Sequence, residues 1–222
     1  MSVVKLEGLV ALLEGFPALT GVDLTVNAGE IVFVKGPNGA GKTTLLHLCA
    51  GLIQPKEGKG QILGHDLSSE RTPIRKRVGL LSHSSGLYRD LTVLENITFW
   101  TQIAGVEKSE IDNRISWALE RMELDNKLQN QKVRSLSVGQ KRRASLAVFI
   151  VRRPDLWLMD EPHAGLDQEG RQAVDDLIEE SVRAGATVIV ASHDLERVLN
   201  LATRVVTLSG GAVVGVDHGG NK

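Results

Sequence analysis

Short apolar runs separated by glycine-rich turns recur along the chain, and their periods predict alternating strands and helices. Residues 31–34, 156–159 and 187–190 are short runs dominated by apolar residues, and the run at 31–34 is rich in β-branched residues. Such runs are typical of strands buried on both faces. Residues 138–152 and 174–182 have helical spacing, and Gly185 closes the second of these helices. Strands that alternate with helices imply a mainly parallel sheet covered on both faces.

The two ends of the chain have a different pattern. The first thirty residues and residues 52–80 predict short extended pieces broken by turns, such as the alternating segment 22–26. Near the C-terminus, residues 205–208 and 212–214 flank Ser209-Gly210-Gly211 and predict a hairpin. We therefore expect short strands outside the alternating region.

A third segment is mostly helical. Five apolar residues recur at the spacing of one helical face, and Ser109 and Asp112 are placed to cap the start of that helix. We predict a helical subdomain over residues 82–134, inserted into a core formed by 1–81 and 135–222. The residues of the apolar face are Ile111, Ile115, Ala118, Leu119 and Met122.

Composition excludes several classes of protein. The chain has 222 residues and a formal net charge of −1, which argues against a nucleic-acid or anionic-membrane binder that depends on a basic surplus. Cys49 is the single cysteine, so no internal disulfide is possible. The longest apolar run, 146–151, is far shorter than the roughly 20 residues of a membrane span. With no signal-peptide pattern at the start, we expect a soluble intracellular α/β protein.

A phosphate-binding loop lies between the strand at 31–34 and the helix that follows. Its pattern is G-x-x-x-x-G-K-[ST], in which the glycines let successive backbone N–H groups converge on phosphate oxygens. The lysine can reach the β- and γ-phosphates, and the threonine hydroxyl can ligate Mg²⁺. The sequence therefore predicts a nucleoside triphosphate site with Mg²⁺. The residues are Gly36, Pro37, Asn38, Gly39, Ala40, Gly41, Lys42 and Thr43, followed by Thr44.

Two adjacent acids, Asp160 and Glu161, end the apolar run at 156–159. An acid at the end of this strand holds Mg²⁺ in P-loop proteins, so Asp160 is the candidate metal residue. Successive strand side chains point to opposite faces. We therefore expect Glu161 to project differently from Asp160 and to meet an attacking water.

Leu136-Ser137-Val138-Gly139-Gln140 stands just before a predicted helix. Ser137 and Gln140 have the spacing of a capping box, so Ser137 should open this helix. A capped helix start beside a small glycine is a second anion site. Because the first loop already cradles one triphosphate, a second anion site suggests that Ser137 faces the nucleotide of a partner chain. The alternative, which a capping box alone favours, is a purely structural cap.

These motifs, in this order, resemble those of ABC-transporter nucleotide-binding subunits along essentially the whole chain. The resemblance implies a P-loop, RecA-like core with an N-terminal antiparallel β-subdomain and an inserted helical subdomain. It implies ATP hydrolysis, Glu161 as the catalytic glutamate, and His193 in contact with the γ-phosphate and with Glu161. Residues 136–140 are similar to the signature that binds nucleotide across a dimer, with Val138 replacing its first glycine. The implied nucleotide contacts are Ser137, Gly139, Gln140 and, in the D-loop-like segment 164–167, Asp167.

Two positions depart from the family pattern. His83 aligns with the glutamine that contacts Mg²⁺ and water and that relays to the membrane subunit. A neutral imidazole can also ligate or orient water, so His83 is a candidate metal residue. The aromatic that stacks on adenine aligns with Leu13, and Phe16 nearby is the candidate replacement.

The resemblance also implies partners and a location. These are a separate integral-membrane transporter subunit, a second ATPase subunit in a homodimer, and a peripheral position on the cytoplasmic side of the membrane. No nucleic-acid partner is expected. The signature with its neighbours and His83 are similar to haem-exporter ATPases of cytochrome c maturation. A drug, lipid or polysaccharide exporter ATPase is the alternative, as are an ABC ATPase not tied to transport, a catalytically inactive binding module and a P-loop small-molecule kinase.

Overall fold

The computed structural model describes residues 1–82, 84–194, 197 and 200–219, and His83 is therefore outside the described residues. The chain divides into two compact units. The first contains residues 1–80, 154–162 and 178–222, and the second contains residues 81–153 and 163–177.

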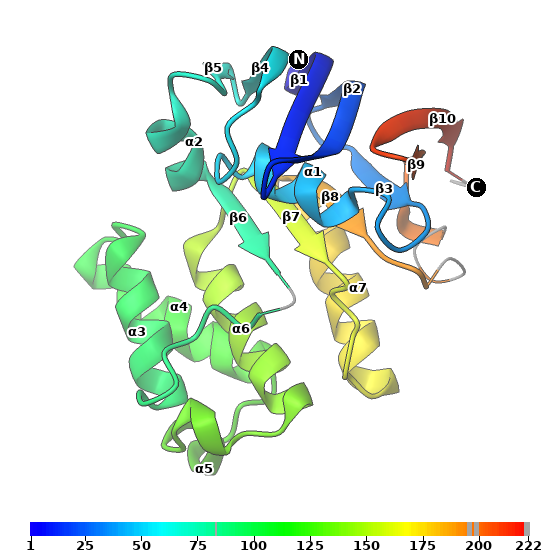
Figure 1. Ribbon diagram of the computed structural model, residues 1–222. Coiled ribbons are helices and arrows are strands. Elements are labelled where there is room, and N and C mark those ends of the chain that lie inside the picture. The colour runs from blue at the N-terminus through cyan, green and yellow to red at the C-terminus, as the bar shows by residue number, and fades with distance from the viewer. Residues whose placement is uncertain (83, 195–196, 198–199, 220–222) are drawn as a thin grey trace. The chain divides into compact units, whose positions relative to one another are not determined.

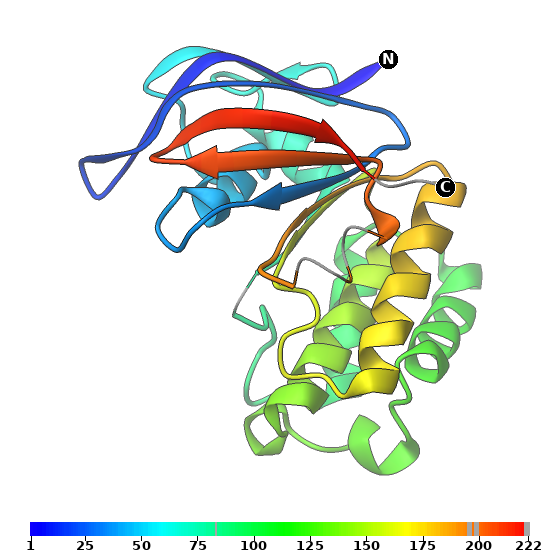
Figure 2. The same ribbon diagram turned by 90° about the vertical axis from the view of Figure 1, so that its right-hand side faces the viewer.

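A six-stranded sheet forms the centre of the first unit, in the order β10-β9-β3-β8-β7-β6. Strands β9, β3, β8 and β7 are parallel neighbours, and β10 closes an antiparallel hairpin with β9 (Figure 2). The continuous apolar runs in β3, β7 and β8 are buried, as the sequence pattern predicts for strands covered on both faces. The bounds are β3 (Ile31–Lys35), β6 (Val78–Leu81), β7 (Leu156–Asp160), β8 (Thr187–Ala191), β9 (Arg204–Ser209) and β10 (Ala212–His218).

A second sheet in the same unit is antiparallel, in the order β2-β1-β4-β5 (Figure 1). Its first two strands are 12 residues each, longer than the short pieces expected from the sequence. The pairing is interrupted by register shifts, one of them between Leu6 and Leu9 around Gly8, and such irregularities hide the strand period. The bounds are β1 (Ser2–Leu13), β2 (Phe16–Asn27), β4 (Glu57–Ile62) and β5 (His65–Asp66).

Two helices of the first unit, α1 and α2, precede β6 in the chain. Helix α1 (Lys42–Cys49) contacts strands of both sheets, and Cys49 is buried on it. Helix α2 (Arg71–Arg77) falls in the segment 52–80, where the sequence predicted only strands. That expectation was wrong for residues 71–77: the helix is only seven residues long, and its Pro73 lies in the first turn, where proline is tolerated.

The second unit is helical, and α3, α4 and α6 pack side by side (Figure 1). The predicted apolar face of α4 is buried at Ile115, Ala118 and Leu119. Ser109 does not cap this helix, because the helix already begins at Lys108 and Glu107 occupies the N-cap position. The bounds are α3 (Val93–Ile103), α4 (Lys108–Arg121), α5 (Asn126–Gln129), a 3₁₀ turn (Val133–Ser135) and α6 (Val138–Arg152).

Helix α7 (Gln168–Arg183) supplies residues to both units. Of its predicted inward positions, Val174, Leu177, Ile178 and Ser181 are buried, whereas Val182 is half-buried. Taken over the described residues, no helix has the length and apolar character needed to cross a bilayer.

The buried strand β7 should tolerate truncation poorly. Leu158 is 0% exposed whereas Leu52 is 52% exposed. We predict that Leu158→Ala lowers the free energy of unfolding by roughly 2–5 kcal/mol, because a cavity is left in addition to the lost transfer energy. The matched control, Leu52→Ala, should cost less than about 0.5 kcal/mol. Urea denaturation of both variants measures the difference, and equal midpoints would contradict the burial of β7.

Candidate nucleotide site

The predicted phosphate loop connects β3 to α1, as the motif requires. Its glycines adopt backbone conformations that L-residues rarely adopt, with φ of 99° at Gly41, the N-cap of α1. A Cβ on Gly41 would lie 2.6 Å from the carbonyl oxygen of Ala18. The loop therefore needs glycine here both for its curvature and for its close packing on β2.

The Lys42 ammonium lies against the loop itself. Its Nζ donates to the carbonyl oxygens of Gly36 at 2.7 Å and of Pro37 at 3.0 Å. These bonds hold the positive charge close to the backbone N–H groups at the start of α1. The arrangement fits a phosphate, because backbone donors and a cation converge on one region.

Thr43 and Asp160 meet at this loop, from segments 117 residues apart in sequence. The Thr43 hydroxyl donates to Oδ2 of Asp160 at 2.7 Å, and Asp160 is 7% exposed. A hydroxyl beside a carboxylate is the oxygen donor pair that suits Mg²⁺, which usually takes its other ligands from water and substrate phosphates. Within the described residues, no group of three or more acidic, histidine or cysteine side chains is arranged to hold a metal ion by itself.

The Glu161 carboxylate is held by two residues that follow β8. Ser192 Oγ donates to Oε2 at 2.8 Å, and Nδ1 of His193 lies 2.8 Å from Oε1. The Glu161 side chain is 24% exposed and that of His193 is 84% exposed. A carboxylate offers about four acceptor positions, so it can hold both donors and still accept from a water.

Glu161 projects differently from Asp160 for a reason that the sequence analysis did not identify. Strand β7 ends at Asp160, and Glu161 has a left-handed backbone with φ of 48°. Its N–H nevertheless donates to the carbonyl oxygen of Ala191 at 2.8 Å. Side-chain alternation along a strand was therefore the wrong explanation. Non-glycine residues in this conformation cluster at functional sites.

Ser192 is a contact that the motif analysis did not select. Its signal was its place directly before His193, at the end of an apolar strand. A serine there is common in turns, so the sequence alone gave no reason to pair it with Glu161, 31 residues earlier.

In the helical unit, the start of α6 has the predicted capping box. The Ser137 hydroxyl accepts from the Gln140 N–H at 3.2 Å, and the Ser137 N–H donates to Oε1 of Gln140 at 2.9 Å. This confirms that Ser137 opens α6. Val138, next in the chain, is 73% exposed.

The segment 164–167 packs closely on this helix start, within the same unit. A Cβ on Gly139 would lie 2.8 Å from the carbonyl oxygen of Gly165, and one on Gly165 would lie 2.9 Å from Cγ1 of Val138. The Asp167 carboxylate accepts from the Gly170 N–H at 2.9 Å and from Arg143 at 3.1 Å. The Gly170 bond and the Arg143 charge lower the pKa of Asp167, so this carboxylate stays ionised.

Phe16, the candidate for adenine binding, takes no part in the contacts described above. Phe16 begins β2 and is 77% exposed, and Leu13 opposite it is 52% exposed. The prediction for His83 falls outside the described residues.

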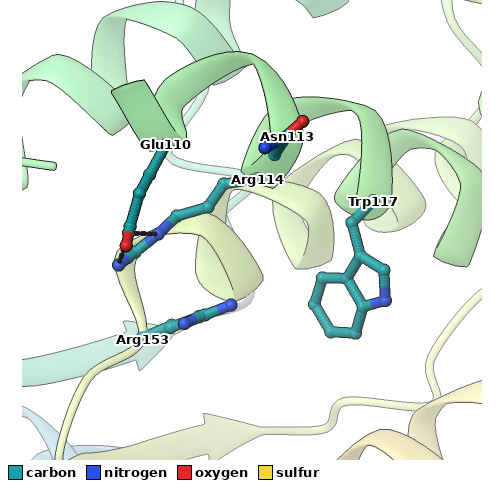
Figure 3. Close-up of a pocket in the computed structure, with 5 residues that line it drawn as sticks. All are labelled: Glu110, Asn113, Arg114, Trp117 and Arg153. Atoms are coloured by element: carbon teal, nitrogen blue, oxygen red, sulfur yellow. Dashed lines mark hydrogen bonds and ion pairs between the residues drawn. The ribbon is translucent and has the colours of Figure 1, made fainter. Parts of the chain in front are cut away.

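A shallow depression in the helical unit contains none of the predicted residues (Figure 3). It is lined by Glu110, Asn113, Arg114 and Trp117 of α4 and by Arg153 after α6. Arg114 donates twice to one oxygen of Glu110, at 2.6 and 3.0 Å. This salt bridge pairs Glu110, the one acid among the described residues that line the depression, with Arg114.

The first unit thus joins a phosphate loop after β3 to an acid at the end of β7, a parallel strand of the same sheet separated from β3 by β8, and this defines a P-loop nucleoside triphosphatase. The chain belongs to the ABC transporter family, whose model matches residues 19–164. The family and its solved cassettes support ATP hydrolase activity, and the fold of the structural neighbours is the ABC ATPase fold.

Relatives with different physiological roles are similar to the chain. The cell division ATP-binding protein FtsE of Escherichia coli is 36% identical over 95% of this chain and 94% of the relative. The sulfate/thiosulfate import ATP-binding protein CysA 1 of Agrobacterium fabrum is 36% identical over 95% of this chain, which spans only 62% of that relative. A dimeric cassette structure, bound to ADP and Pi after hydrolysis, is 28% identical with a TM-score of 0.86, over 99% of this chain and 100% of that one.

The close packing of Gly41 can be tested against Gly39, which also has a positive φ but has no atom within 4 Å of an added Cβ. We predict that Gly41→Ala weakens ATP binding at least about tenfold more than Gly39→Ala does, because only the first must displace backbone. Titration with a fluorescent ATP analogue measures both affinities. Equal losses would show that conformational strain alone, and not the contact with Ala18, makes glycine necessary.

Proposed function

We propose that this chain is the ATP-hydrolysing subunit of an ABC transporter and drives substrate movement through a separate membrane subunit. The main support for this function is the position of the Glu161 carboxylate, which is held between Ser192 and His193. In the same unit, Thr43 and Asp160 meet at the phosphate loop. Together these residues supply what hydrolysis of a triphosphate needs, namely phosphate binding, a metal-binding pair and a base.

Each residue has a distinct role in this proposal. The Gly36–Thr43 loop and Thr44 bind the phosphates through backbone N–H groups, with Lys42 reaching the terminal phosphates. Thr43 and Asp160 hold Mg²⁺, which when bound neutralises charge on the phosphate oxygens. Glu161 accepts a proton from the attacking water. His193 orients Glu161 and contacts the γ-phosphate, and Phe16 lies against adenine. His83 is proposed as a further contact to the metal or its water.

The helical unit supplies a second half-site to a partner chain. The capped helix start at Ser137, with Gly139 and Gln140, is suited to binding an anion. Asp167 belongs to the segment packed against this helix start. The dimeric state of the similar cassette bound to ADP and Pi supports this arrangement. We therefore propose a homodimer in which Ser137 of each chain contacts the triphosphate bound at Lys42 of the other.

The transported substrate is a separate question, because the membrane subunit forms its path. The similarity of residues 136–143 and of His83 to haem-exporter ATPases favours haem export as the finer hypothesis. The relatives named above act in import and in cell division and lend it no support. A drug, lipid or polysaccharide exporter is the alternative.

In each case we propose a peripheral position on the cytoplasmic side of the membrane. Copurification of the membrane subunit, followed by its identification, distinguishes these functions.

The proposed base is tested by Glu161→Gln. The amide keeps the shape of the side chain but cannot accept the proton, and loss of a general base lowers the rate roughly 10²–10⁴-fold. We predict unchanged ATP affinity, very slow hydrolysis and accumulation of a dimer with ATP bound. Phosphate release and gel filtration measure these effects. Hydrolysis at close to the wild-type rate would contradict the assignment of Glu161.

The shared site is tested by mixing two inactive variants. Ser137→Arg should abolish hydrolysis while leaving ATP binding at Lys42 intact, and Lys42→Ala should remove phosphate binding. A mixed dimer has one composite site with both intact residues, so we predict partial recovery of activity on mixing. Each variant alone is the control. Native mass spectrometry shows whether mixed dimers form. If they form and activity does not recover, one intact composite site is not sufficient for hydrolysis.

A further inference from the structure

A buried histidine–aspartate pair lies outside the residues to which a function was assigned above. His163 follows Glu161 by two positions, and Asp175 is on α7. His163 Nε2 lies 2.8 Å from Oδ1 of Asp175, and their side chains are only 5% and 9% exposed. The pair belongs wholly to the helical unit.

The second ring nitrogen of His163 fixes the direction of this hydrogen bond. Nδ1 is buried and has no hydrogen-bond partner among the described residues. A proton on Nδ1 would leave a buried N–H without an acceptor, which is costly. In the neutral ring the proton is therefore on Nε2, and His163 donates to Asp175.

This bond anchors the start of the turn that carries Asp167. Within the turn, the Leu166 N–H donates to the carbonyl oxygen of His163 at 3.3 Å. Arg171 Nε donates to the carbonyl oxygen of Leu166 at 3.1 Å. Asp167 is held in turn by the Gly170 N–H and Arg143. The turn is thus attached at its beginning through His163 and at its end through Asp167.

We propose that His163 is a positioning residue for ATP hydrolysis. Through Asp175 it holds the turn 163–167, which carries Asp167. A buried ion-forming pair contributes little stability compared with apolar residues of the same volume, whereas its hydrogen bond is directional. The inference rests on the proposed hydrolysis of ATP and on Asp167 as part of the second half-site.

Three substitutions at one position separate the hydrogen bond from the volume of the side chain. The amide of His163→Gln reaches about as far as Nε2 and can donate to Asp175. The amide of His163→Asn reaches only as far as Nδ1. We expect His163→Ala and His163→Asn to lower kcat roughly 10- to 100-fold through misplacement of the turn. His163→Gln should retain most of the wild-type kcat. In all three, KM for ATP should change less than about twofold, because phosphate binding is unaltered.

A matched control is Ser181→Ala, which removes another buried side-chain bond of α7, from Ser181 Oγ to the carbonyl oxygen of Ile178. It should lower the thermal midpoint without lowering kcat. If His163→Ala does not fold, the comparison of the Gln and Asn variants decides. Equal kcat in those two variants, or a wild-type kcat in His163→Ala, would overturn the proposal.

Glu161→Gln is measured in the same assay to keep the two ideas separate. If Glu161→Gln hydrolyses ATP at the wild-type rate, Glu161 is not the base. The positioning role of His163 is then still decided by the kcat values of His163→Gln and His163→Asn. A slow Glu161→Gln together with equally active His163→Gln and His163→Asn contradicts only the positioning role.

Discussion

The register between three parallel strands determines where the phosphate loop and the proposed catalytic groups lie. Ala191, the last residue of β8, pairs with Val34 of β3 on one side and with Asp160 of β7 on the other. The ladder continues one step further, from the Glu161 N–H to the carbonyl oxygen of Ala191. Because the carboxyl ends of neighbouring parallel strands lie at the same edge of a sheet, ligands bind there. The phosphate loop after β3 and the acids at the end of β7 both depend on this alignment.

Conformations that are unfavourable locally accompany this edge of the sheet. Glu161 has a left-handed backbone, and the contacts of its carboxylate with Ser192 and His193 hold it in place. Gly36 and Gly41 approach other backbone segments too closely for any Cβ. Such strain persists only where the surrounding structure determines it from several directions. The rigid sheet therefore supports a loop and a carboxylate that an isolated segment would not maintain.

Local patterns were sufficient to predict much of this structure. The apolar runs of β3, β7 and β8, the helix over residues 138–152, and the Ser137–Gln140 cap all follow from short-range periodicity and spacing. What the sequence did not reveal depends on contacts between distant segments. The length of β1 and β2 is obscured by register shifts. The contact of Ser192 with Glu161 and the pair of His163 with Asp175 require the tertiary fold, because no local pattern joins them.

We propose that Thr43, at the start of α1, and Asp160, at the end of β7, hold one Mg²⁺ ion for the triphosphate. The most direct measurement is a double-mutant cycle of Thr43→Val and Asp160→Asn, with ATP affinity titrated as a function of Mg²⁺ concentration. If both residues hold the same ion, removing either one should abolish most of the Mg²⁺ dependence, and the two losses should be non-additive by at least about 0.5 kcal/mol. Losses that simply add would contradict a shared site.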